Sequence, residues 1–267
     1  MTLTYRLDSD VIANYDWMIS KQTVKFLIDP PLVYSWDQVL SAVSQKTKLV
    51  AELVSNCYTD SKREEYTAEL SQFISVDSYG SCSGIVCEDC NKMLADDYLF
   101  YLAFENSVCR DYVTEKFWRM KKLIVPIVLR KSDYVNIVPE GSFIAIDQFR
   151  SSKDLANYLR YLSVNRTEYL NYFEWTKHFL ASSVQNYGYF CELCKTISDD
   201  VLPPKVYENI EKWWVEGGNC QIDFAEQFVS IHGASEKRKL IILLLIVVVA
   251  LFMTFHSRRI TKATEIV

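Results

Sequence analysis

Short apolar runs alternate with amphipathic segments through the middle of the chain. Residues 48–54 form an apolar run that predicts a buried strand, and a loop is predicted where the run ends at Ser55. Apolar and aromatic positions then recur at helical spacing over residues 64–73, and residues 75–79 are predicted to be extended again. The same alternation predicts further strands over 98–104, 123–129 and 142–146, and further helices over 112–120 and 153–179.

Strands that alternate with helices are typical of an α/β fold in which helices cover both faces of a parallel sheet. Ligands of such sheets bind beyond the carboxyl ends of the strands. Three stretches follow predicted strands, namely residues 55–63, residues 105–116 and the loop around residues 133–134. The chain has no Gly-x-Gly-x-x-Gly, Walker or Gly-x-Ser-x-Gly motif. A nucleotide site at this edge would therefore depend on side chains.

A second kind of pattern lies near the C-terminus. Residues 240–255 carry no charge, and Thr254 is their one polar side chain, while basic residues flank the run on both sides. This predicts a transmembrane helix, with a buried core helix as the alternative. At about 1.5 Å per residue the run falls short of the ~30 Å hydrocarbon core, which suits a thin early-secretory bilayer.

Composition places the chain among globular proteins. Apolar residues make up 49% of the 267 residues, enough for a substantial core. The net charge of -5 offers no basic field for binding nucleic acid. An anionic ligand would have to be held by a few well-placed cations.

The eight cysteines are partly clustered, which allows two interpretations. The pairs Cys87/Cys90 and Cys191/Cys194 could supply four thiolates to zinc. Disulfides formed in an oxidising lumen are favoured, and we expect Cys191 and Cys194 to be oxidised, either to each other or to other cysteines. The glycosylation sequon Asn165-Arg-Thr167 fits the same compartment.

The N-terminal residues argue against a lumenal position of the protein. They have no apolar region like that of a signal peptide. A single span at the C-terminus is the arrangement of a tail-anchored protein whose body faces the cytosol. Either the natural N-terminus lies upstream of Met1, or the cysteines stay reduced.

Residues 98–118 place acids, amides, a lysine and tyrosines between a predicted strand and a predicted helix. Asp111 or Thr114 can cap the helix, whose first turn then holds Glu115 and Lys116. A lysine is unfavourable at a helix N-terminus, so it suggests a bound anion. A solvated Glu-Lys pair is the alternative.

This stretch resembles the signature of the α1,3-fucosyltransferases, glycosyltransferase family 10, which reads Phe-Tyr-Leu-x-Phe-Glu-Asn-Ser followed by Asp-Tyr-Val-Thr-Glu-Lys. The resemblance extends over about residues 2–195, although residues 117–126 are about two residues shorter than the family pattern. Further family-like stretches are residues 4–10, 53–57 with Arg63, 125–129, 141–144 and 172–175.

The resemblance implies the C-terminal, Rossmann-like half of a GT-B fold. In this family Arg63 and Lys116 would hold the diphosphate of GDP-fucose, and Glu115 would hold the ribose. The family's carboxylate base lies upstream of the Thr-Tyr-Arg motif, so no catalytic residue is assigned. No metal site is assigned, because two cations suffice for the diphosphate, although a divalent ion such as Mn is possible. The donor-binding residues that the resemblance implies are Tyr5, Ser55, Asn56, Arg63, Tyr101, Asn106, Tyr112, Glu115 and Lys116.

The chain is therefore expected to transfer L-fucose from GDP-fucose in α1,3 linkage, with inversion, to GlcNAc of a glycan or glycoprotein acceptor. It is expected in the Golgi membrane as a single-pass protein, with the tail-anchored cytosolic orientation as the alternative. The alternatives for function are an inverting transferase of another GDP-sugar, and an inactive membrane-anchored fragment that binds a GDP-sugar or a glycan. The expected division is an interdomain segment (1–47), a GDP-fucose-binding domain (48–195), a helical tail and linker (196–239), the transmembrane helix (240–255) and a basic tail (256–267).

Overall fold

The structure is a computed structural model, and it describes residues 1–22, 32–182, 188–198 and 206–229. None of the helices in these ranges has the length and hydrophobicity that a membrane span requires. The transmembrane helix expected over 240–255 lies outside the described residues, as does the basic tail over 256–267. Both stay predictions.

A five-stranded parallel sheet forms the centre of the larger lobe, which confirms the predicted α/β fold. Its strands lie in the order β4-β3-β5-β6-β7. β5 is buried along its whole length, as expected of a central strand covered on both faces. The strands are β3 (Lys48–Leu53), β4 (Val76–Tyr79), β5 (Tyr98–Leu102), β6 (Val125–Val128) and β7 (Ile144–Ala145).

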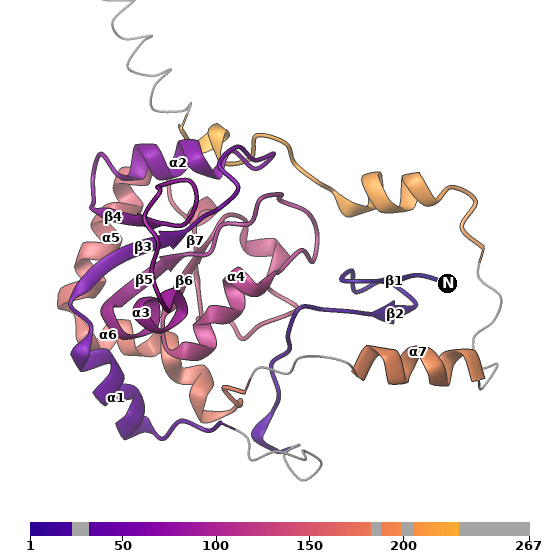
Figure 1. Ribbon diagram of the computed structural model, residues 1–267, viewed down its shortest axis with the longest axis horizontal. Coiled ribbons are helices and arrows are strands. Elements are labelled where there is room, and N and C mark those ends of the chain that lie inside the picture. Colours follow the sequence, from indigo (N-terminus) through magenta and orange to yellow (C-terminus); the bar gives the residue numbers. More distant parts are fainter. Residues whose placement is uncertain (23–31, 183–187, 199–205, 230–267) are drawn as a thin grey trace, which may run out of the picture.

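The helices cover both faces of this sheet. The chain moves from β3 to β4 and then reverses to reach β5, so right-handed connections place α2 (Arg63–Leu70) and α3 (Cys90–Asp97) on opposite faces. Accordingly α2 contacts α5 (Ser152–Val164), and α3 contacts α1 (Trp36–Gln45) (Figure 1). Val39 and Val43 of α1 are buried in the core of the sheet, although they lie within the segment expected to join domains.

Two predicted helices are shorter than the apolar spacing suggested. The helix predicted over 112–120 is a four-residue helix, α4 (Glu115–Trp118), followed by a 3-10 turn over Arg119–Lys122. The helix predicted over 153–179 is broken by Asn165, which follows α5 and caps α6 (Arg166–Leu170). Apolar spacing continued beyond α4 and α6 because the 3-10 turns that follow these helices also bury side chains.

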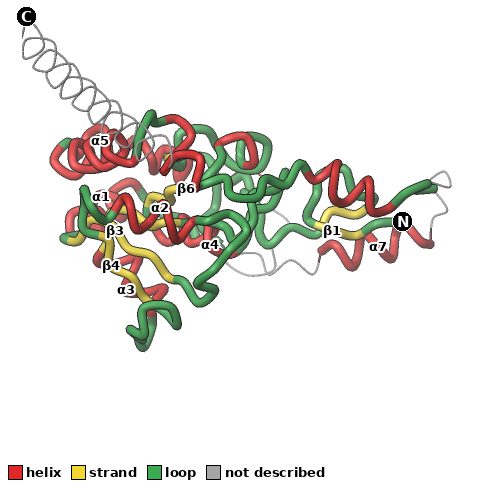
Figure 2. The backbone as a smooth tube through the Cα atoms, turned by 90° about the horizontal axis from the view of Figure 1, so that it is seen from above, coloured by secondary structure: helices red, strands yellow, loops and turns green. Residues whose placement is uncertain are grey.

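A smaller lobe lies beside the larger one. It contains the strand pair β1 (Leu3–Thr4) and β2 (Val11–Ile12), which run parallel, and α7 (Gly188–Ser198). Figure 2 shows this lobe as a narrow extension that carries β1 and α7 away from the sheet. The disulfide Cys109–Cys220 ties the C-terminal part of the described chain to the loop that follows β5.

Three disulfides form, which agrees with the preference for disulfides over zinc. They join Cys57 to Cys82, Cys87 to Cys90, and Cys109 to Cys220. Because Cys87 and Cys90 are joined to each other, the zinc site proposed for them with Cys191 and Cys194 is excluded. The prediction that Cys191 and Cys194 are oxidised is wrong, because both are free and exposed on α7.

One buried lysine supports the edge of the sheet. The side chain of Lys46 is 2% exposed, and its Nζ donates hydrogen bonds to the carbonyl oxygens of Ala95 and Tyr98. Burial lowers the pKa of Lys46 to about 8, against the opposing charges of Asp96 and Asp97. Above about pH 8 the folded chain therefore releases a proton that the unfolded chain keeps up to about pH 10.4.

We expect this difference to make the protein more stable as the pH rises from about 8 to about 9.5. The neutral form of Lys46 is tolerated in the buried site, whereas the charged form costs free energy there. This cost returns as the pH falls through the folded pKa, because the buried side chain then takes up a proton. Relative to Lys46→Met, the free energy of unfolding should rise by about 1.5 kcal/mol across this range. Urea unfolding of both variants at the two pH values measures it. If the free energy of unfolding changed equally with pH in the two proteins, Lys46 would not titrate between pH 8 and 9.5.

Candidate functional site

A cavity of about 350 Å³ opens where the connections of the sheet change direction. The chain leaves β3 toward β4 on one side, and β5 lies on the other side of β3. Ligands of open α/β sheets bind outside the carboxyl ends of the strands at such a switch point. The residues that line the cavity are Leu53, Ser55, Asn56, Arg63, Asn106, Glu115, Lys116 and Arg119.

The fold explains why these side chains converge. Ser55 and Asn56 follow β3, and Asn106 follows the neighbouring strand β5. Arg63 is the first residue of α2, and Glu115 is the first residue of α4. Each segment therefore begins or ends at the carboxyl edge of the sheet, which brings residues far apart in the sequence to one cavity.

Two guanidinium groups at the cavity have no carboxylate within ion-pair distance among the described residues. Arg63 is 3% exposed, and its Nη1 and Nη2 donate to the carbonyl oxygens of Phe104 (2.6 Å) and Asn56 (3.0 Å). Arg119 donates from Nε to Asn91 Oδ1 (2.8 Å) and from Nη1 to the hydroxyl of Tyr101 (2.8 Å). A guanidinium has five N–H donors, so both keep positive charge and donors for a ligand.

Two buried atoms at the same cavity lack hydrogen-bond partners among the residues that the structure describes. They are Arg63 Nε and Asn106 Oδ1. A buried polar atom without a partner costs about 1–3 kcal/mol, so native proteins rarely keep one without a reason. A ligand that accepts a hydrogen bond from Arg63 and donates one to Asn106 would satisfy both.

Lys116 is placed between two carboxylates. Its Nζ lies 3.4 Å from Glu105 Oε2 and 3.1 Å from Glu115 Oε1. Burial raises the pKa of Glu105, although the charge of Lys116 and hydrogen bonds from Thr114 oppose that shift. Burial also acts to raise the pKa of Glu115, but the charge and hydrogen bond of Lys116 outweigh it, so the pKa is lowered. Without a ligand, the anions beside this lysine are thus two residues of its own chain.

Six of the nine expected donor residues line the cavity: Ser55, Asn56, Arg63, Asn106, Glu115 and Lys116. Tyr101 is fully buried, and its hydroxyl accepts a hydrogen bond from Arg119. Tyr5 and Tyr112 do not line the cavity; their rings contact each other, with centroids 5.0 Å apart. Leu53 and Arg119 are lining residues that sequence reasoning missed. Arg119 lies in the 3-10 turn after α4, where nothing in the sequence distinguishes it from a surface arginine.

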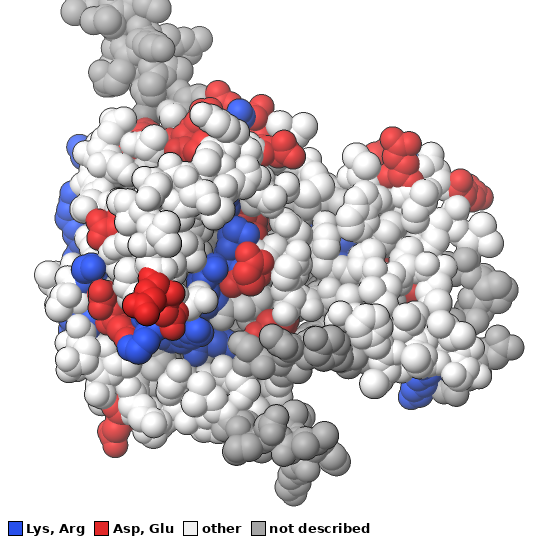
Figure 3. Space-filling model, in the orientation of Figure 1, with Lys and Arg blue, Asp and Glu red and all other residues white. Residues whose placement is uncertain are grey.

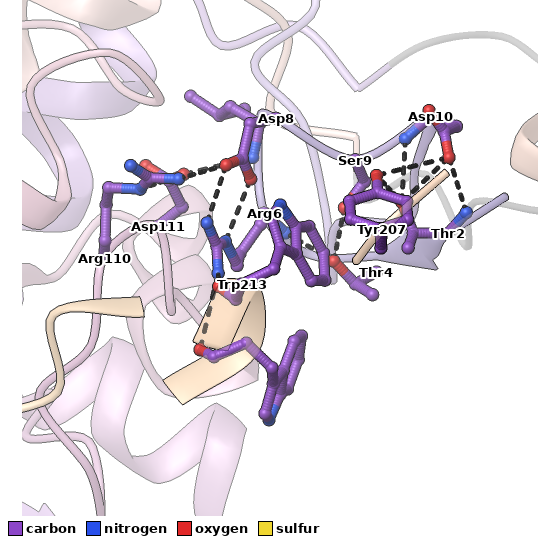
Figure 4. A network of polar contacts seen from close by, with 12 residues as sticks. Thr2, Thr4, Arg6, Asp8, Ser9, Asp10, Arg110, Asp111, Tyr207 and Trp213 are labelled. Atoms are coloured by element: carbon purple, nitrogen blue, oxygen red, sulfur yellow. Dashed lines mark hydrogen bonds and ion pairs between the residues drawn. The ribbon is translucent and has the colours of Figure 1, made fainter. Parts of the chain in front are cut away.

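A polar network fixes the smaller lobe against the loop before α4 (Figure 4). Asp8 accepts hydrogen bonds from Arg6, at 2.6 Å from Nη2 and 2.9 Å from Nε, and from Arg110 at 2.5 Å. Asp111 accepts one from the backbone N–H of Leu7 at 3.1 Å. Tyr5 is next to Arg6 in the chain, and Tyr112 is next to Asp111. The network therefore joins the two segments whose tyrosine rings contact each other.

Charge distinguishes this cavity from a second one of about 310 Å³ beside β7. The second cavity contains one lysine, Lys131, and that lysine is paired with Glu140 at 3.4 Å. Its other charged lining residue is Glu168. Figure 3 shows basic and acidic side chains gathered on the face of the larger lobe that carries α4. An anion is therefore better accommodated at the switch point than beside β7.

Comparison with known proteins shows similarity to fucosyltransferases. The family model described as glycosyltransferase family 10 (fucosyltransferase) C-term matches residues 43–213. The chain is 36% identical over 236 residues to α-(1,3)-fucosyltransferase C of Drosophila melanogaster, covering 83% of this chain and 55% of that protein. It is 37% identical over 242 residues to α-(1,3)-fucosyltransferase fut-1 of Caenorhabditis elegans, covering 84% and 53%.

The chain thus spans about half the length of these relatives. Among solved structures, a crystal structure of α1,3-fucosyltransferase with GDP-fucose covers 62% of this chain and 51% of its own chain, with a TM-score of 0.49 and 21% identity.

Proposed function

Because the chain belongs to glycosyltransferase family 10, we propose that the switch-point cavity binds GDP-fucose and that the protein serves the transfer of L-fucose. The transfer makes an α1,3 linkage, with inversion, to GlcNAc of a glycan or glycoprotein. Two relatives are named as α-(1,3)-fucosyltransferases, which supports the linkage.

One observation carries the proposal: two guanidinium groups meet at one cavity beyond the strand ends, and neither has a carboxylate partner in the described part of the chain. A nucleoside diphosphate brings at least two negative charges, and arginine suits its oxygens because the planar fork can donate two parallel hydrogen bonds. The donors that Arg63 and Arg119 retain, including the unpaired Nε of Arg63, are the groups we assign to the diphosphate.

The same groups can lower the barrier to transfer. When the bond between fucose and phosphate breaks, negative charge grows on the departing GDP. Fixed cations stabilise that charge more in the transition state than in the bound donor, and this difference accelerates the reaction. Burial strengthens the effect at Arg63, which is held in place by two backbone carbonyl groups.

Glu115 and Asn106 are assigned to uncharged parts of the donor. The lowered pKa of Glu115 keeps its carboxylate ionised, and an ionised carboxylate is a strong acceptor for ribose hydroxyls. Asn106 Oδ1 can accept a hydrogen bond from another hydroxyl or an amine of the donor. When Glu115 turns to the ribose, Lys116 loses one of its two carboxylate partners and becomes a third cation for the diphosphate.

We place the protein in the Golgi membrane, with the apolar segment over residues 240–255 as its membrane anchor. The three disulfides support a lumenal position for the body of the protein, because such bonds are rare in reducing compartments. They count against the tail-anchored cytosolic orientation.

Titration of the full chain in detergent with GDP-fucose, GDP-mannose and UDP-galactose tests the proposal. We expect GDP-fucose to bind saturably and to be displaced by GDP, while UDP-galactose does not compete. Tighter binding of GDP-mannose would favour a transferase of another GDP-sugar. Failure of all three to bind would overturn the proposal.

Arg119 is the basis of a further prediction, because it lines the cavity and none of the described carboxylates pairs with it. We expect Arg119→Ala to weaken GDP binding about tenfold, the loss of one charge-assisted hydrogen bond. The matched control is Arg150→Ala, because Arg150 is exposed and does not line the cavity. Calorimetric titration with GDP measures both. Equal GDP affinity in the Arg119 variant and the wild type would remove Arg119 from the site.

A further inference from the structure

Asn165 lies at the junction between α5 and α6, outside the donor cavity. It begins the single Asn-x-Ser/Thr tripeptide of the sequence, Asn165-Arg166-Thr167. Arg166 and Thr167 are exposed, and Asn165 is partly exposed. The tripeptide is therefore accessible in the folded protein, whereas the same tripeptide in a buried helix would be inaccessible.

The side chain of Asn165 contacts an exposed tyrosine. Its Nδ2 donates a hydrogen bond to the hydroxyl of Tyr161 at 2.7 Å, and its Oδ1 accepts one from the backbone N–H of Glu168 at 3.3 Å. Tyr161 is 49% exposed, and its ring stacks on that of Tyr158 with centroids 6.3 Å apart. A group bonded to Nδ2 would begin beside the Tyr161 ring.

We propose that Asn165 is N-glycosylated and that the first sugar packs against the ring of Tyr161. The tyrosine suits this contact because it offers an apolar ring to the C–H face of a sugar and a hydroxyl to its polar edge. The ligand is an oligosaccharide supplied as a lipid-linked diphosphate.

The modification is compatible with the helix junction. In the reaction, Nδ2 forms a bond to the anomeric carbon, the bond between that carbon and the diphosphate breaks, and the lipid diphosphate leaves. The amide gives one of its two protons to the base of the transferring enzyme. The remaining proton can still bond to Tyr161, and Oδ1 still caps α6, so the cap survives.

The glycan would lie at the edge of the sheet opposite the donor cavity. α5 begins after β7, at the carboxyl edge, and its 13 residues return along the sheet to the amino edge. The contact from Arg166 Nη1 to the carbonyl oxygen of Val43 (3.1 Å) agrees, because Val43 precedes β3. We therefore expect no effect of the glycan on GDP affinity.

This inference rests on the lumenal position given under the proposed function. To test it, the full chain is produced behind a secretory leader in insect cells, and its intact mass is measured before and after an amidase that removes N-linked glycans. Thr167→Ser keeps the acceptor tripeptide, and Thr167→Ala removes it without touching Asn165. We expect one glycan on the wild type and on Thr167→Ser, and none on Thr167→Ala. An unmodified wild-type chain recovered from the secretory membranes of these cells would overturn the proposal, whether or not the chain binds GDP.

The contact with Tyr161 has its own test. The melting temperature is measured with and without the glycan, using Thr167→Ala as the unmodified form, in the wild type and in Tyr161→Ala. We expect the glycan to raise the melting temperature by about 2–4 °C when Tyr161 is present and to leave it unchanged in Tyr161→Ala. Equal increments in both backgrounds would show that the sugar does not pack on the ring.

Discussion

Replacing Lys116 by alanine is expected to weaken GDP binding about 10- to 100-fold. A hydrogen bond to a charged group contributes about 1.5–3 kcal/mol, and the loss of one cation from a diphosphate site falls in this range. In the structure Lys116 is paired with Glu105 and Glu115, so the variant also leaves two carboxylates facing the cavity. Their repulsion of the diphosphate adds to the loss. Calorimetry with GDP measures the change.

Removing Lys116 also leaves the buried carboxylate of Glu105 without its cation, which can destabilise the fold. The double variant Glu105→Gln/Lys116→Ala removes both charges and keeps the fold testable. We expect it to bind GDP more weakly than the wild type as well. Lys92→Ala is the matched control, because Lys92 is exposed on α3 and paired with Asp96. Wild-type affinity in the double variant would show that Lys116 does not contact the donor.

Loss of the Cys109–Cys220 disulfide is expected to lower the free energy of unfolding by about 2–5 kcal/mol. This bond joins residues 111 positions apart, so in the chain-entropy description it greatly restricts the unfolded chain. It also holds the segment around Gly218 to the loop after β5, where Arg110 N–H donates to Gly218 O at 2.8 Å. Urea unfolding of Cys109→Ala/Cys220→Ala, compared with the wild type, measures the loss.

The matched control is the disulfide Cys87–Cys90, which joins residues only three positions apart. In the same description its removal costs about 2 kcal/mol, because so short a loop restricts the unfolded chain much less. We expect the Cys109–Cys220 variant to be clearly the less stable of the two. The reverse order would contradict the chain-entropy explanation of these two disulfides.

The strands were predictable because their residues are mostly apolar or aromatic, as expected of buried strands. The run from Tyr98 to Leu102 is apolar or aromatic at every position, and all five residues are buried. Two helices on one face, α1 and α3, were not predicted. Few of their side chains are buried, and their beginnings depend on local caps, the Ser35–Gln38 capping box and the Asp89 side chain. Such caps are common outside helices as well, so they indicate a start only when a strong apolar pattern follows.

The candidate site was predictable to the extent that it follows strand ends. Asn106, Glu115 and Lys116 come from one continuous stretch after β5, whereas Arg119 is brought to the cavity by the 3-10 turn and held by Asn91. That contact is tertiary, because α3 supplies Asn91. Disulfide partners were not predictable for the same reason: eight cysteines allow many pairings, and the fold alone selects among them.

The most direct test of the account compares GDP with guanosine as ligands of the wild-type chain. The account assigns binding chiefly to Arg63, Lys116 and Arg119, which would contact the diphosphate. Calorimetric titration should therefore give an affinity for GDP at least about 100-fold higher than for guanosine, since two or more charge-assisted hydrogen bonds are lost with the diphosphate. Raising the ionic strength should reduce the difference between the affinities for GDP and guanosine, because salt screens charges at an open cavity. Equal affinities for GDP and guanosine would contradict the assignment of the switch-point cavity as a diphosphate site.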